Sequence, residues 1–182
     1  MIYEALSCLT SEMNDYLKLK LSATEDKIVL SGLVNPDGSM AVQGENKVLL
    51  TLVNLEKETA TRKTTIPNKA TDMNINMYVL FSAYFGSSNY AEALRFLSFV
   101  VGFLQQKNVF TRTNTPRLDK NIQKLIVEME SLTSERLNNL WGTLGAKYIP
   151  SVLYKVRMLT YDEAVLREFR PEITGVGVNE PS

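Results

Sequence analysis

One stretch near the middle of the chain alternates between hydrophobic and polar residues more regularly than any other. From Met73 to Phe85 every second residue is apolar, and most positions between are asparagine, serine or tyrosine. Side chains of a β-strand point alternately to its two faces, so this period predicts a long strand with one buried face. The apolar, β-branched run Val48–Leu55 predicts a second, well-buried strand. We expect the two strands to pair antiparallel.

Two helices are predicted, one before these strands in the sequence and one after them. In the first 21 residues apolar side chains recur at spacings of three and four, which indicates an amphipathic helix. A second helix is expected from Asn89, as N-cap with Glu92 three residues on, to about Lys107. It is apolar nearly all round, so every side should be covered, one by the sheet and the other by a further helix or a neighbouring subunit. Its large side chains are predicted to pack in the core or between subunits: Phe96, Phe99 and Phe103.

The rest of the chain predicts shorter elements. Thr133 should cap a short helix that ends at Gly142 and Gly145 and carries Trp141, which we expect to pack in the core or between subunits. Alternating or extended segments are expected at Ile28–Val34, Val109–Thr115, Ile122–Met129 and Val152–Leu159, of which the last two are the third and fourth main strands.

The predicted fold is therefore α+β. It has a mainly antiparallel sheet of about four strands, with the N-terminal helix and the long apolar helix packed chiefly on one face. Residues 1–162 form one core domain, and residues 163–182 form an extended tail or arm with too little periodicity to belong to that core.

The composition excludes several function classes. Twenty basic residues balance twenty acidic ones among 182 residues, so broad nucleic-acid binding, which relies on a basic surface, is not expected. The chain has no histidine, which removes the commonest general base and the commonest transition-metal ligand. The longest apolar run, from Phe96 to Leu104, is too short for a membrane span, and the N-terminus has no basic signal-peptide region.

Candidate chemical sites are weak. Glu128 and Glu130 share one face of a predicted strand, but that face is usually the solvated one, so we expect no catalytic pair. No spacing of acidic residues predicts a metal site, and no glycine-rich turn predicts a cofactor phosphate. Cys8 is expected to be a buried structural thiol on the first helix. From the residues alone, an assembling α+β scaffold without enzymatic activity is the favoured interpretation.

Three stretches carry a resemblance to a known family. They are Met1–Leu9 with the residues up to Lys18, Asn89–Gln105 running into Lys107–Phe110, and Leu137–Leu159. Together with Asn46-Lys-Val and Asn54-Leu-Glu, they resemble the tail-terminator (cap) proteins of extracellular contractile injection systems, phage-tail-like particles of the antifeeding-prophage and Photorhabdus virulence-cassette type. The resemblance covers residues 1 to about 162.

The resemblance implies a structural role similar to that of phage tail terminators. A homohexameric ring would bind the distal end of the inner tube and sheath of a bacterial particle, terminate polymerisation and fix length. It implies neither catalytic residues nor cofactor, and no nucleic-acid, membrane or small-molecule partner. Assembly in the cytoplasm, followed by incorporation into the particle, is expected.

Two groups of contact residues are predicted with this role. Basic residues on loops are expected to face the lumen or the tube: Arg62, Lys63, Arg112 and Arg117. The tail is expected to contact the sheath by adding a strand or filling a groove, through Glu163, Phe169, Ile173, Val176 and Val178. Alternatives are another ring or adaptor of the same particle, at the baseplate or along the tube, and a small α+β enzyme.

Overall fold

A computed structural model of the chain describes residues 1–21, 24–58 and 74–160. The chain forms three α-helices and six strands in these ranges, with a short 3₁₀ turn, η1 (Ser87–Asn89), ahead of the second helix. The predicted tail and the predicted contacts Arg62 and Lys63 lie outside the described residues.

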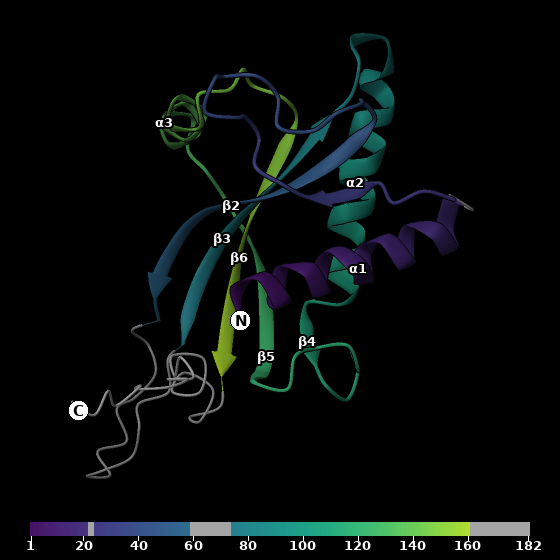
Figure 1. Cartoon of the computed structure of the whole chain (residues 1–182), viewed down its shortest axis with the longest axis vertical. Helices are drawn as coiled ribbons and strands as arrows, with labels where there is room; N and C mark the ends of the chain where they lie inside the picture. Colours follow the sequence, from purple (N-terminus) through teal and green to yellow (C-terminus); the bar gives the residue numbers. More distant parts are fainter. Residues whose placement is uncertain (22–23, 59–73, 161–182) are drawn as a thin grey trace, which may run out of the picture.

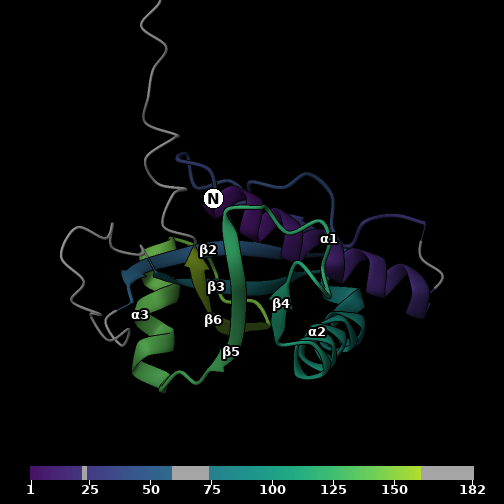
Figure 2. The same ribbon diagram turned by 90° about the horizontal axis from the view of Figure 1, so that it is seen from below.

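All six strands belong to one curled sheet (Figures 1 and 2). Its order is β1-β2-β3-β6-β5-β4, so the chain's first and fourth strands lie at the two borders. The strands are β1 (Ile28–Leu30), β2 (Lys47–Lys57), β3 (Ile75–Tyr84), β4 (Val109–Thr111), β5 (Ile122–Glu130) and β6 (Ser151–Thr160).

The α+β class is confirmed, but the strand number and the sheet type differ from the prediction. The sheet has six strands instead of about four, because β1 and β4 are three residues long and too short to show a period. It is mixed, since β1 runs parallel to β2 while the other neighbours are antiparallel. A long connection, residues 31–46, returns the chain to the start of β2 and makes the parallel pairing feasible.

The two long helices lie on one face of the sheet, and the short third helix lies on the other. The helices α1 (Ile2–Leu21) and α2 (Tyr90–Gln106) pack on the face that carries Val48, Val79 and Val156, and together they form the larger hydrophobic cluster. The third helix, α3 (Ser134–Leu144), covers part of the opposite face. There Trp141 packs with Leu49, Leu80 and Leu153 in a smaller cluster.

In the single chain, α2 is covered on the side that faces the sheet. Ala93, Phe96 and Val100 are buried against the sheet, but Leu94 is 45% exposed and Tyr90 57% exposed. The packing leaves one side of the helix open to solvent.

The ends of the helices follow their sequence signals in part. The Thr133 hydroxyl accepts a hydrogen bond from the Arg136 amide, and Gly145 ends α3 in the left-handed conformation with φ of 66°. Asn89 precedes α2, but its side chain does not cap the helix. Its side-chain Nδ2 instead donates a hydrogen bond to Asn46 Oδ1 at 3.1 Å.

A one-residue irregularity divides β2. The pairing with β3 shifts register between Leu52 and Asn54, which indicates a β-bulge at Val53. Before the bulge Leu50 and Leu52 face α1 and α2; after it, Leu55 faces that side and Glu56 lies beside Tyr78 on the other. In the outer half of β2, Asn54 and Glu56 thus lie on the face shared with α3, and Leu55 and Lys57 lie on the face of α1 and α2.

Candidate assembly surfaces

Two asparagine side chains occupy the outer edges of the two border strands. At β1, Asn14 of α1 is 5% exposed, and its Oδ1 accepts hydrogen bonds from the amides of Ile28 at 2.9 Å and Lys27 at 3.0 Å. Its Nδ2 donates to the Ile28 carbonyl at 2.8 Å. One carboxamide therefore pairs with both polar groups of Ile28 on the side away from β2.

Asn114 performs the same role at β4. Its Oδ1 accepts from the Thr111 amide at 2.8 Å, and its Nδ2 donates to the Val109 carbonyl at 2.9 Å. The amides of Asn114 and Thr115 also donate to the Thr111 carbonyl, at 3.1 and 2.8 Å. An unpaired strand edge is a template for association with another strand. At both borders, side chains or turns of the same chain form hydrogen bonds with backbone groups where another strand would otherwise pair.

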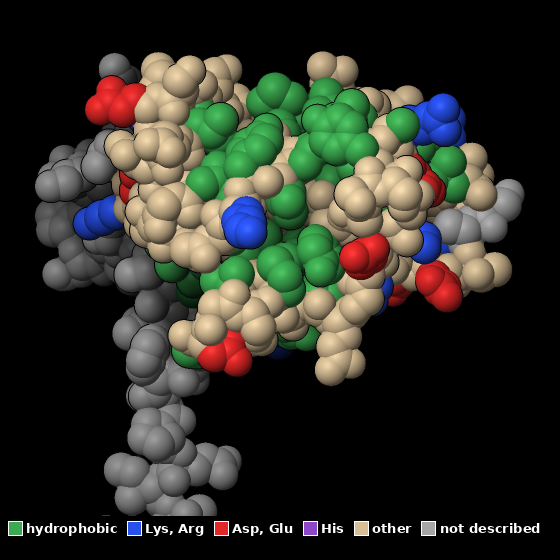
Figure 3. Space-filling model, turned by 90° about the horizontal axis from the view of Figure 1, so that it is seen from above, with side chains coloured by type: hydrophobic (Ala, Val, Ile, Leu, Met, Phe, Trp, Pro, Cys, Tyr) green, Lys and Arg blue, Asp and Glu red, His purple; other side chains and the backbone are tan. Residues whose placement is uncertain are grey.

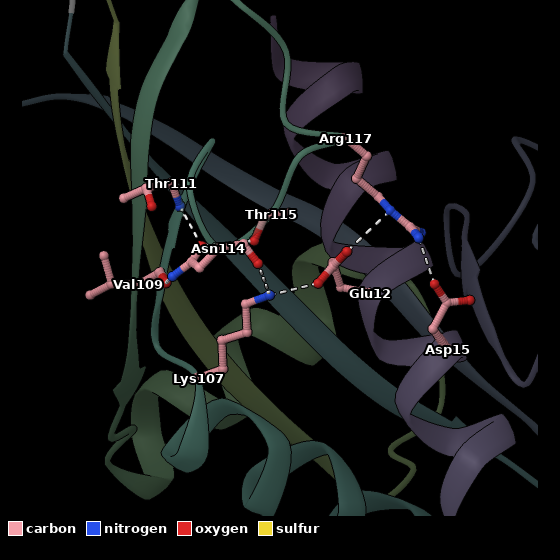
Figure 4. Close-up of polar contacts among 8 residues, drawn as sticks. All are labelled: Glu12, Asp15, Lys107, Val109, Thr111, Asn114, Thr115 and Arg117. Carbon is pink, nitrogen blue, oxygen red and sulfur yellow. Dashed lines mark hydrogen bonds and ion pairs between the residues drawn. The ribbon is translucent and has the colours of Figure 1, made fainter.

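A network of ion pairs fastens α1 to the loop that contains Asn114 (Figure 4). The carboxylate of Glu12 accepts from Lys107 Nζ at 2.7 Å and lies 3.1 Å from Arg117 Nε. Arg117 reaches Asp15 at 2.6 Å, and this hydrogen bond raises the pKa of the guanidinium. Lys107 also donates to the Asn114 carbonyl at 3.1 Å and lies over the Phe110 ring, 5.0 Å from its centroid. Glu12 is only 17% exposed, so this cluster is partly shielded from solvent.

The predicted basic contacts have different surroundings. Arg117 lies on the connection between β4 and β5 and is bound to α1 through Glu12 and Asp15. Arg112 lies on the exposed turn that follows β4. Among the described residues, Arg112 and Arg117 share no ion-pair partner and no hydrogen-bond partner.

The predicted packing residues lie mostly inside the monomer. Phe96 and Phe103 are buried in the larger cluster, and Phe99 is half-buried at its margin with its ring 6.2 Å from that of Phe96. Trp141 is buried and contacts Tyr148 edge-on, with ring centroids 5.4 Å apart. These two aromatic side chains line a shallow surface pocket with Ser134, Leu137 and Asn138.

Exposed hydrophobic side chains gather at one end of the molecule. Seen from above, this end holds the start of α2 and the loop ahead of β6, and it shows a broad hydrophobic surface (Figure 3). Tyr90 and Leu94 come from α2 and Tyr148, 60% exposed, from the loop. Leu97 and Val101, half-buried, extend the stripe along α2 at helical spacing. Hydrophobic patches of this kind mark surfaces for protein contact.

The described residues contain little that could serve chemistry. The Cys8 thiol is buried in α1, and burial, aided by the charge of Glu12, raises its pKa to about 11. Glu128 lies on the solvated face of β5, 3.5 Å from Arg157. Within residues 1–21, 24–58 and 74–160 no group of three acidic or cysteine side chains could hold a metal ion. No helix in the same ranges is both long and hydrophobic enough to span a bilayer.

Sequence reasoning missed the two edge asparagines and the Glu12 network. The position of Asn14 between Met13 and Leu17, which lie on the buried face of α1, is a signal that could have indicated a buried polar contact. No local signal pairs Asn114 with β4, because a three-residue strand shows no period.

Two terminators are among the solved structures whose folds are similar to that of this chain. One is the sheath/tube terminator of a PVC extracellular contractile injection system in the extended state, with a TM-score of 0.61 and 14% identity over 88% of this chain and 56% of that one. The other is the tube terminating cap of the anti-feeding prophage, with a TM-score of 0.53 and 14% identity over 96% of this chain and 60% of that one. The chain thus spans less than two thirds of either terminator.

Comparison of the sequence with family models agrees with the structural comparison. No curated protein matches the chain. A family model described as the Pvc16 N-terminal domain matches residues 5–174, which is most of the chain and extends past the predicted domain boundary at residue 162. The chain belongs to the Pvc16 N-terminal domain family.

Proposed function

We propose that this protein is a structural terminator of a contractile injection system, which caps the distal end of the inner tube and sheath. The observation that carries the proposal is the family match over residues 5–174, together with a fold shared with two solved terminators. A fold alone does not define a function, so the surface has to suit the role as well.

The proposed assembly is a closed homohexameric ring with head-to-tail contacts. The exposed stripe of α2, from Tyr90 through Leu94, supplies a hydrophobic surface that a neighbouring copy would cover. A terminator ring should remain a single layer, whereas the rings of a tube protein stack layer upon layer. This difference separates a terminator from a tube or adaptor component.

Contacts with the tube and sheath are assigned within this proposal. Arg112, which is exposed, and the partly exposed Arg117 would face the tube or lumen, as would Arg62 and Lys63. Residues 163–182 would bind the sheath as an extended arm. The role requires no catalysis and no cofactor, and assembly would take place in the cytoplasm before the particle is complete.

Deletion of the gene followed by electron microscopy of the particles tests the proposal. Tubes and sheaths of irregular or excessive length are expected without the terminator, and complementation should restore uniform length. Particles of normal, uniform length would refute the cap role. The mass of the purified protein in solution tests the ring: a single hexamer supports it, whereas open-ended polymers favour a tube component.

A further inference from the structure

The sheet has one further edge, along the outer half of β2. β1 pairs with β2 only at Val48–Leu50, and the Thr51 hydroxyl donates to Ser31 at the end of that pairing. From Leu52 to Lys57, no strand within the described part of the chain lies beside the outer edge of β2. In Figure 1 this half of β2 forms the left border of the sheet.

The backbone groups at this edge point outward at alternate residues. The Glu58 amide donates to the Asn74 carbonyl, toward β3, at 2.9 Å. Because the direction of bonding alternates along a strand, the amides and carbonyls of Leu55 and Lys57 point away from β3, to the open edge. The Leu55 side chain is 45% exposed, which is unusual for a leucine in a six-stranded sheet.

The chemistry of the two faces at this edge differs. Leu55 offers a hydrophobic contact on the face of α1, which it shares with Lys57. On the other face the Glu56 carboxylate, exposed to solvent, accepts from the Tyr78 hydroxyl at 3.0 Å and from Asn54 Nδ2 at 3.2 Å. Burial raises the pKa of Tyr78, and its hydrogen bond to Glu56 and the charges of Glu56, Glu130 and Glu58 add to this. Lys155 and Arg157 lie farther from the edge on the same face, opposite Tyr78 and Asn76, so Glu56 is the charged side chain that a strand added at the edge would meet first on this face.

We propose that the outer edge of β2, residues 52–57, accepts a β-strand from a different protein, and that this strand carries basic residues on one face and hydrophobic residues on the other. Basic side chains of the partner would lie beside Glu56, and hydrophobic ones beside Leu55. Asn14 binds the outward backbone groups of Ile28 at β1, and Asn114 binds those of Val109 and Thr111 at β4, which favours strand addition at the edge of β2. The proposal stands apart from the cap role and can be tested without a particle.

Three synthetic peptides test whether a strand binds here. The first alternates lysine and valine over seven residues and is expected to bind the full chain. Two analogues carry N-methyl groups, one on the valines and one on the lysines, which removes the amide donors of one edge while charge and side chains stay the same. An added strand uses only one of its edges, so one analogue should lose at least about tenfold in affinity and the other should bind as the parent does. Equal binding by all three peptides, or no binding by the parent, would overturn the proposal.

Protein variants and hydrogen exchange locate the site. Glu56→Lys should weaken binding of the parent peptide about tenfold, whereas Glu25→Lys, an equal charge change on an exposed loop, should leave it unchanged. The bound peptide should slow exchange at the amides of Leu55 and Lys57. Equal loss in both variants, or protection at another strand, would contradict the assignment. Protection of the same amides by self-association, in the absence of peptide, would replace the proposed partner with a second copy of this chain.

Discussion

Replacing Asn14 with alanine tests how much the edge amide at β1 contributes to stability. The change removes partners at 2.8 and 2.9 Å from the carbonyl and amide of Ile28, a residue only 1% exposed. A buried polar group left without a partner costs about 1–3 kcal/mol, so two such groups should lower the free energy of unfolding by about 2–6 kcal/mol. The Lys27 amide is nearer to solvent and should add little. For a chain of this size the melting temperature should fall by roughly 4–24 °C.

Urea denaturation followed by circular dichroism measures this loss. Ser11→Ala, a change at a half-buried site on the same helix, serves as the control and should alter the free energy by less than about 0.5 kcal/mol. A loss in Asn14→Ala no larger than that of the control would refute the reasoning, because water would then be satisfying the Ile28 groups.

Asn14→Asp separates the donor from the acceptor. The new carboxylate can still accept from the Ile28 amide but, when ionised, opposes the Ile28 carbonyl. Only its protonated form can donate there, so burial and this contact should raise its pKa in the folded state above the ordinary value of about 4. Relative to the native chain, the variant should be most stable below that value and lose stability as the pH rises through the folded-state pKa. A difference that does not vary between pH 3 and pH 7 would contradict the assignment of Nδ2 as the donor.

Three further outcomes are expected. Glu12→Gln should lower the free energy of unfolding by about 1–3 kcal/mol in urea titrations, because the charged contacts to Lys107 and Arg117 weaken. This difference should shrink in 1 M salt. A loss that does not depend on salt would contradict its electrostatic origin. The Cys8 thiol, buried and with its pKa raised to about 11, should resist a maleimide at pH 8 until urea unfolds the chain; rapid labelling of the folded protein would refute this. Leu94→Glu should leave the thermal stability of the monomer nearly unchanged but reduce its self-association in analytical ultracentrifugation, whereas Gln106→Glu, exposed on a different side of α2, should not; equal effects would argue against the stripe.

The elements with strong local signals could be predicted from the sequence. The alternation around β3 spans many residues, and the signals at Thr133 and Gly145 act within a single turn, so each identifies its element without knowledge of the rest of the fold. The family likewise could be identified from motifs spread over the chain, and the family match confirms it.

The sheet borders could not be predicted, because their cause is not local. The direction of β1 depends on how the chain returns to β2, and β4 is defined by its pairing with β5. The roles of Asn14 and Asn114 depend on those borders, so both residues looked like ordinary surface asparagines. A related reason applies to α2: a uniformly hydrophobic helix does not reveal which of its sides the single chain leaves exposed.

The contacts of α1 span very different distances along the chain, and this has a consequence for folding kinetics. Asn14 reaches β1 across 14 residues, whereas Glu12 reaches Lys107 across 95 and Asp15 reaches Arg117 across 102. Short loops close at lower entropic cost, so α1 and β1 can associate early, while the ion pairs form only after both halves of the chain have come together. Substitutions at Asn14 should therefore slow folding, and substitutions at Arg117 should mainly speed unfolding. Contacts of α1 would then form in both the first and the last steps of folding.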